Sequence, residues 1–152
     1  MNQGARANRS GHSAEQIIAC VLKEHGFRFR RQCKICDSIY GHPIKVDFFI
    51  ENAEGYPDGL AVECKWQDVS GSIDEKFPYL VLNIKEKFPC PAVIMLDGSG
   101  QRPGSIEWIR KQTDDKLIAV FTISEFLSWV LREIRPKSVL FSHNSVRTRI
   151  IA

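Results

Sequence analysis

The sequence predicts an α/β fold in which helices flank a mixed β-sheet. The first half of the chain holds alternating apolar segments separated by turn residues, which is typical of antiparallel strands. The second half holds short, continuous apolar runs separated by segments of helical periodicity, which is typical of strands covered on both faces. We therefore expect the order helix, three strands, helix, strand, helix, strand and helix.

The composition indicates one soluble domain. The chain has 152 residues, of which 43% are apolar and 26% are charged. It shows no signal peptide and no apolar run near the ~18 residues that span a bilayer, so we expect a cytoplasmic protein without a membrane partner. Five cysteines, an odd number, indicate reduced thiols rather than a disulfide framework.

Capping and turn signals give the expected boundaries. Residues 1–12 are polar and read as a flexible basic arm, and Ser13 to Gln16 form a capping box that opens a helix ended by Gly26. The main domain is expected over residues 13–135, and residues 136–152 form a basic and apolar extension. Within the domain, we expect strands at 27–35, 44–51, 60–67, 92–96 and 117–121, with helices at 73–88, from about 105, and from the capping box at 122–125 until Pro136.

The strand at 60–67 carries polar residues on one face. Alternation puts Glu63, Lys65 and Gln67 on this face and apolar residues on the other. The preceding strand presents Asp47 on its polar face, and a turn-rich connection at 52–59 predicts an antiparallel hairpin. Folding this hairpin brings Asp47 beside Glu63.

Two carboxylates and a lysine are the groups that metal-assisted phosphodiester hydrolysis needs. Carboxylate oxygens suit Mg²⁺, which acidifies a water and neutralises charge on the phosphate. Lys65 holds the attacking water, helps to deprotonate it, or stabilises the developing charge, and the sequence leaves these roles open. A solvated strand face with a same-side ion pair is the structural alternative.

Asp47 followed by Glu63-Cys64-Lys65 resembles the Asp…(Asp/Glu)-X-Lys signature of the PD-(D/E)XK nuclease superfamily. The resemblance extends over about residues 13–132, including the segments 71–79, 89–93, 97–100 and 126–129. It implies a restriction-endonuclease-like αβββαβ core, with Asp47, Glu63 and the Cys64 backbone carbonyl binding Mg²⁺, Mn²⁺ as a substitute, and Lys65 positioning the nucleophile. The literal Pro-Asp dipeptide, Pro57-Asp58, precedes Glu63 by only five residues, so Asp47 is assigned as the first carboxylate.

Two further residues are candidates for the catalytic site. A glutamate on the first helix often joins the metal site in the resembling family, which makes Glu15 a candidate ligand; an acid favoured by the helix dipole is the equal alternative. Gln67 continues the polar face, where its amide can hold a water or a phosphate. A surface glutamine at the strand end is the alternative.

The net charge of +3 is mild, but basic residues gather near both ends of the chain. They suit a phosphate backbone, and a solvated face explains them nearly as well. A Gly-rich segment at 97–104 lacks the ending of a P-loop, so we expect no nucleotide cofactor. The candidate DNA contacts are Arg6, Arg9, Ser72, Lys76, Arg102, Arg147 and Arg149.

These features predict a Mg²⁺-dependent DNA endonuclease of restriction type, which cuts double-stranded DNA. A homing or recombination and repair nuclease of the same fold is the nearest alternative, and a catalytically inactive DNA-binding module is the alternative from another class. One site in a 17.3 kDa chain predicts a homodimer or higher homo-oligomer, because cutting both strands normally needs two sites.

Overall fold

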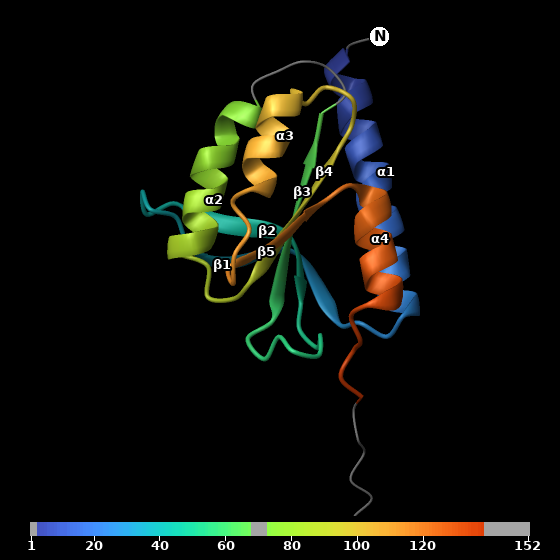
Figure 1. Ribbon diagram of the computed structural model, residues 1–152. Helices are drawn as coiled ribbons and strands as arrows, with labels where there is room; N and C mark the ends of the chain where they lie inside the picture. Colours follow the sequence, from blue (N-terminus) through green and yellow to red (C-terminus); the bar gives the residue numbers. More distant parts are fainter. Residues whose placement is uncertain (1–2, 68–72, 139–152) are drawn as a thin grey trace, which may run out of the picture.

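The computed structural model describes residues 3–67 and 73–138 and contains one mixed sheet between two pairs of helices. The strands are β1 (Phe29–Asp37), β2 (Pro43–Ile50), β3 (Leu60–Trp66), β4 (Ala92–Asp97) and β5 (Leu117–Phe121). The helices are α1 (Gln3–Glu24), the short 3-10 helix η1 (Asp74–Lys76), α2 (Phe77–Glu86), α3 (Pro103–Arg110) and α4 (Ile123–Arg132). Figure 1 shows α1 and α4 on one side of the sheet and α2 and α3 on the other.

The sheet has the order β1-β2-β3-β4-β5. The pairs β1–β2 and β2–β3 are antiparallel, and the pairs β3–β4 and β4–β5 are parallel. Both the predicted element order and the predicted mixed sheet are therefore confirmed. Antiparallel neighbours come from the two hairpins, whereas α2 and α3 provide the longer connections that parallel strands require.

Two hydrophobic clusters cover the two faces of β3. Leu60 and Val62 lie in the cluster that α1 and α4 cover, together with Phe48 and Trp129. Ala61 faces the other way and packs in the cluster that α2 and α3 cover. Both faces of the sheet are thus covered by helices, and α2 lies over the face of β3 that carries Glu63 and Lys65.

The structure corrects several element boundaries. Helix α1 begins at Gln3, so Ser13 lies inside it and its capping box does not start the helix; most of the segment predicted as a flexible arm is helical. The predicted helix at 73–88 is divided into η1 and α2, with Pro78 in the first turn, where no backbone donor is lost. The Thr122 capping box is confirmed, and α4 ends at Arg132.

None of the helices that the structure describes is both long enough and apolar enough to cross a bilayer.

Candidate active site

The pairing of β2 with β3 ends where the two predicted carboxylates lie. Phe48 opposite Val62 is the last pair of this ladder, and Asp47 and Glu63 are the next residues on the two strands. Asp47 Oδ2 accepts a hydrogen bond from the backbone N–H of Cys64 over 2.7 Å. The carboxylate thus accepts a hydrogen bond from a backbone N–H of β3 at the point where the backbone pairing of β2 with β3 ends. This bond fixes Asp47 against β3.

Glu63 and Lys65 form a largely buried ion pair. Lys65 Nζ donates to Glu63 Oε2 over 2.6 Å, and the Glu63 side chain is only 5% exposed. Burial raises the pKa of Glu63, against the lowering effect of the Lys65 charge. Burial alone would lower the pKa of Lys65, but the charge and hydrogen bond of Glu63 outweigh it, so this pKa is raised. Lys65 is therefore an ammonium at neutral pH.

Gln32, a residue that the sequence did not indicate, completes the surroundings of Asp47. Its Nε2 donates to Asp47 Oδ1 over 2.9 Å. On β1, Arg31 pairs with Phe48 and Cys33 pairs with Val46, so Gln32 lies between these pairs with a φ of 47°. A left-handed backbone is unfavourable for a residue with a Cβ and concentrates at functional sites.

A family model described as a PD-(D/E)XK nuclease superfamily domain matches residues 6–134. The chain belongs to the PD-(D/E)XK nuclease superfamily. Membership confirms the resemblance seen in the sequence and agrees with the five-stranded mixed sheet. It indicates a nuclease, and a nuclease domain implies DNA as the substrate. No curated protein and no solved structure matches the chain.

The carboxylates of this nuclease domain fit a divalent cation. PD-(D/E)XK nucleases generally use divalent metals. Asp47 and Glu63 offer hard oxygen ligands from adjacent strands, and Mg²⁺ needs only one or two carboxylates because waters and substrate phosphate complete its coordination. Within the described ranges, no three His, Cys, Asp or Glu side chains are grouped to hold a metal ion by themselves.

Glu15 lies near this nuclease site but has another partner. Its carboxylate accepts from Arg31 Nη2 over 2.9 Å. Burial raises the pKa of Cys64, and the nearby charges of Asp47, Glu15 and Glu63 raise it further, in that order. Glu15 thus lies close enough to influence the same thiol electrostatically as Asp47 and Glu63 do, but its hydrogen-bond partner is Arg31.

Gln67 is buried rather than a surface residue, so the structural alternative considered for it is wrong. It is 7% exposed, its backbone N–H donates to Asp97 O, and its Nε2 donates to Gly100 O over 3.1 Å. Its Oε1 is buried and has no hydrogen-bond partner in the part of the chain that the structure describes. A buried acceptor without a donor is costly, and it is available to a water or a ligand.

Among the predicted DNA contacts whose side chains the structure describes, Lys76 is the one that lies near the candidate catalytic residues. Lys76 lines a cavity that also reaches Glu63 and Lys65. Arg102 Nε lies 3.4 Å from Asp74 Oδ2, so an acidic side chain already balances its charge. The remaining predicted contacts have no described side chain: Arg6 and Arg9 lie on α1 with only their backbone described, and Ser72, Arg147 and Arg149 lie outside the described residues.

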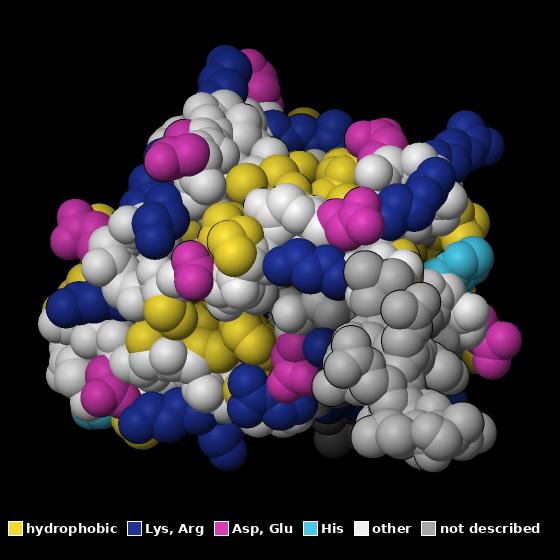
Figure 2. All heavy atoms as spheres, turned by 90° about the horizontal axis from the view of Figure 1, so that it is seen from below, with side chains coloured by type: hydrophobic (Ala, Val, Ile, Leu, Met, Phe, Trp, Pro, Cys, Tyr) yellow, Lys and Arg dark blue, Asp and Glu magenta, His cyan; other side chains and the backbone are white. Residues whose placement is uncertain are grey.

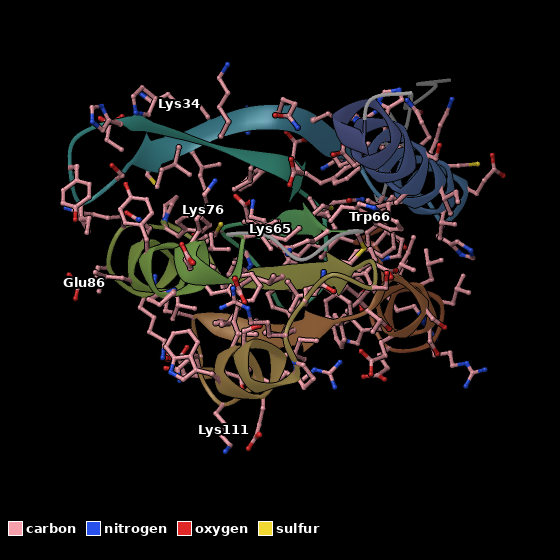
Figure 3. The ribbon with its side chains drawn as sticks, turned by 90° about the horizontal axis from the view of Figure 1, so that it is seen from above. Lys34, Lys65, Trp66, Lys76, Glu86 and Lys111 are labelled. Atoms are coloured by element: carbon pink, nitrogen blue, oxygen red, sulfur yellow. The ribbon has the colours of Figure 1, made fainter. Side chains whose placement is uncertain are left out.

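The charged side chains are arranged differently in the views from above and from below. Figure 3, seen from above, shows Lys65 and Lys76 between the β1–β2 hairpin and the remaining elements. Figure 2 shows the face seen from below, where Lys and Arg side chains are interspersed with Asp and Glu around exposed hydrophobic groups. Among the described side chains on this face, the mixture of charges does not single out a phosphate-binding surface.

Proposed function

We propose that the protein is a Mg²⁺-dependent endonuclease that hydrolyses phosphodiester bonds in double-stranded DNA, with Mn²⁺ able to replace Mg²⁺. The observation that carries this proposal is the meeting of Asp47, Glu63 and Lys65 where the β2–β3 ladder ends. Family membership supports a nuclease in general. The choice of DNA duplex and of Mg²⁺ rests on the carboxylate ligands and on the restriction-type resemblance.

Asp47, Glu63 and the backbone carbonyl of Cys64 would hold the cation. The cation, when bound, supplies charge neutralisation at the phosphate and lowers the pKa of a coordinated water. Asp47 reaches this position already oriented, because its two oxygens accept from Cys64 N and Gln32 Nε2. Such supporting bonds fix a ligand's direction and are typical of the groups around metal ligands.

Lys65 acts as a charged donor in this proposal. Its ammonium, which donates to Glu63 Oε2, orients the attacking water and stabilises negative charge on the phosphate. Gln67 Oε1, which has no hydrogen-bond partner among the described residues, accepts a hydrogen bond from a water in this proposal. Glu15 joins the ligands only if its bond to Arg31 opens.

One site per chain leads us to propose a homodimer or higher homo-oligomer for cutting both strands. Light scattering with duplex DNA present measures the mass of the complex. Two chains on one duplex support the proposal, and a single chain that still produces double-strand breaks in one binding event contradicts it.

Cleavage of supercoiled plasmid tests the proposed activity. Plasmid should be nicked and linearised with Mg²⁺ or Mn²⁺, and EDTA should stop the reaction. Asp47→Asn, Glu63→Gln and Lys65→Met should each lower the rate by ~10²-fold or more while DNA binding survives. Wild-type rates in these three variants, with circular dichroism showing that they fold, would exclude the assigned site. DNA binding without cleavage under all metals would instead indicate a binding module.

A further inference from the structure

A cavity of about 340 Å³ lies directly beside the catalytic residues and has no role in the proposal above. Glu63 and Lys65 are among the residues that line it. The turn between β1 and β2, with the start of β2, forms one wall, and the first turns of α2 with Lys76 form the other. Any ligand in this cavity would therefore touch the same strand that carries the catalytic groups.

The two walls are tied together by hydrogen bonds. The backbone N–H of Ile39, in the β1–β2 turn, donates to Asn83 Oδ1 on α2 over 2.9 Å. Asn83 is 1% exposed, and its Nδ2 donates to Tyr79 O over 2.8 Å. Because this buried amide connects the turn with the helix, the cavity is already formed without a ligand.

The charges that line the cavity favour an anion. Lys45, Lys65 and Lys76 contribute ammonium groups, and His42 contributes an imidazole. Among the lining residues the only acid is Glu63, which already accepts a hydrogen bond from Lys65. Lys45 and Lys76 therefore face the cavity without an acid on its walls to neutralise them. Figure 3 shows Lys76 close to Lys65, whereas Lys111 lies on the far side of the molecule.

The remaining lining is apolar and aromatic. Ile44 and Leu80 lie on opposite walls, and Tyr79 lies at the α2 side. The Tyr79 ring stacks on Tyr40, with centroids 5.4 Å apart and planes 19° apart, and Tyr40 is 72% exposed. An exposed aromatic pair beside cationic side chains is typical of surfaces on which nucleic-acid bases stack.

The volume limits which part of a nucleic acid can enter. Ligand pockets commonly measure about 300–1,000 Å³, so this cavity is of a size for a small ligand and not for a duplex, whose major groove alone is about 12 Å wide. We propose that the cavity binds one unpaired nucleotide of the DNA, next to the phosphate that is cut. Its base packs against Tyr79 and the apolar walls, and Lys45 and Lys76 hold its phosphate.

This inference rests on the proposed function for the position of the cut, and it predicts a preference among DNA structures. A nucleotide inside a duplex must be unpaired and unstacked before it can enter, which costs binding energy. DNA that already carries an unpaired nucleotide avoids that cost. Such DNA should therefore bind about tenfold more tightly than the fully paired duplex.

Fluorescence anisotropy in EDTA, where no cleavage occurs, measures this preference. The probes are a labelled duplex and the same duplex with a single unpaired nucleotide, and the readout is the ratio of their Kd values. Tyr79→Ala and Lys76→Ala should each bring the wild-type ratio of about ten towards one. Trp108→Ala, at an aromatic residue on α3 that is 39% exposed like Tyr79, and Lys111→Ala are the matched controls and should keep the ratio.

Tyr40→Ala separates base stacking from anchoring of the turn, because Tyr40 stacks on Tyr79 but does not line the cavity. The ratio should fall less in Tyr40→Ala than in Tyr79→Ala. Equal binding of the two probes by the wild-type protein, or equal loss in all four cavity and control variants, would overturn the inference. If the protein cuts plasmid but binds both probes with equal Kd values, only this inference is contradicted. If the Kd values differ about tenfold but plasmid is not cut, only the proposed function is contradicted.

Discussion

Gln32 holds Asp47 from a strained backbone position. Its side-chain amide donates to Asp47 Oδ1 over 2.9 Å, and its φ of 47° lies in the left-handed region. This conformation costs a residue with a Cβ about 1–2 kcal/mol relative to glycine. The bond to a proposed metal ligand gives the strained conformation a role.

Gln32 variants separate the hydrogen bond from the backbone strain. Gln32→Ala should lower plasmid cleavage by about 10–100-fold, as removal of a group that orients a metal ligand does. Gln32→Gly removes the same bond and relieves the backbone, so it should be more stable than Gln32→Ala by about 1 kcal/mol but equally slow. Urea unfolding and cleavage rates measure both effects. Full activity in either variant would show that Asp47 does not depend on Gln32.

The buried Glu63–Lys65 pair predicts strong coupling in stability. Glu63→Gln leaves Lys65 without its counter-charge, and Lys65→Met leaves Glu63 buried without its donor. Each single variant should lose about 2–4 kcal/mol, whereas the double variant should lose less than the sum by more than about 1 kcal/mol. Urea unfolding of the four proteins gives the coupling free energy. Strictly additive losses would mean that the pair is not formed in solution.

Gly98 is predicted to be essential for the position of Gln67. Its φ is +95°, and a Cβ at this residue would lie 2.2 Å from the backbone oxygen of Gln67. Gly98→Ala should therefore cost about 2 kcal/mol or more and reduce cleavage. Gly104→Ala, where a Cβ would meet no atom within 4 Å, is the matched control. Thermal unfolding compares the two, and equal melting temperatures would refute the close approach.

Asp114 predicts a pH-dependent contribution to stability away from the site. Hydrogen bonds from Lys85 and from the backbone of Leu117 and Lys116 lower its pKa to about 2. Because this value lies below the unfolded value of about 3.9, the stabilisation is complete above pH ~4 and is lost as the pH falls towards 2.

Asp114→Asn should therefore lower stability at pH 7 by about 1 kcal/mol, a small value because the Asp114 side chain is 35% exposed. The difference from the wild type should shrink as the pH falls from 4 to 2. Thermal unfolding across this range measures it, with Asp115→Asn at the adjacent exposed acid as the control. A difference that stays constant with pH would disprove the assignment.

The sequence was sufficient for the parts of the fold that local patterns determine. The strand at 117–121 was predicted with the observed boundaries, and the Thr122 capping box was found because its residues contact each other within one turn. The alternation pattern and the turn-rich connection at 52–59 together predicted that Asp47 and Glu63 lie side by side on neighbouring strands. This prediction succeeded because the pairing of the two strands is set by the hairpin between them. The Ser13 capping box failed because the same local motif occurs inside a longer helix.

What the sequence could not give depends on contacts between distant segments. Burial of Glu63 and Gln67 depends on segments that follow them in the chain, and a strand pattern says nothing about these. The Ile39–Asn83 hydrogen bond and the Tyr40–Tyr79 stack beside the cavity join residues about 40 positions apart. The strained backbone of Gln32 has no sequence signal, since glutamine is not a residue that favours positive φ.

Binding of Mn²⁺, followed by electron paramagnetic resonance, tests most directly whether Asp47 and Glu63 share a divalent cation. The wild-type protein with a DNA duplex should bind Mn²⁺ at one site per chain, Mg²⁺ should compete for it, and Asp47→Asn or Glu63→Gln should lose most of the affinity. Lys65→Met should keep the site, because it removes no ligand. Unchanged Mn²⁺ affinity in both carboxylate variants would contradict the account.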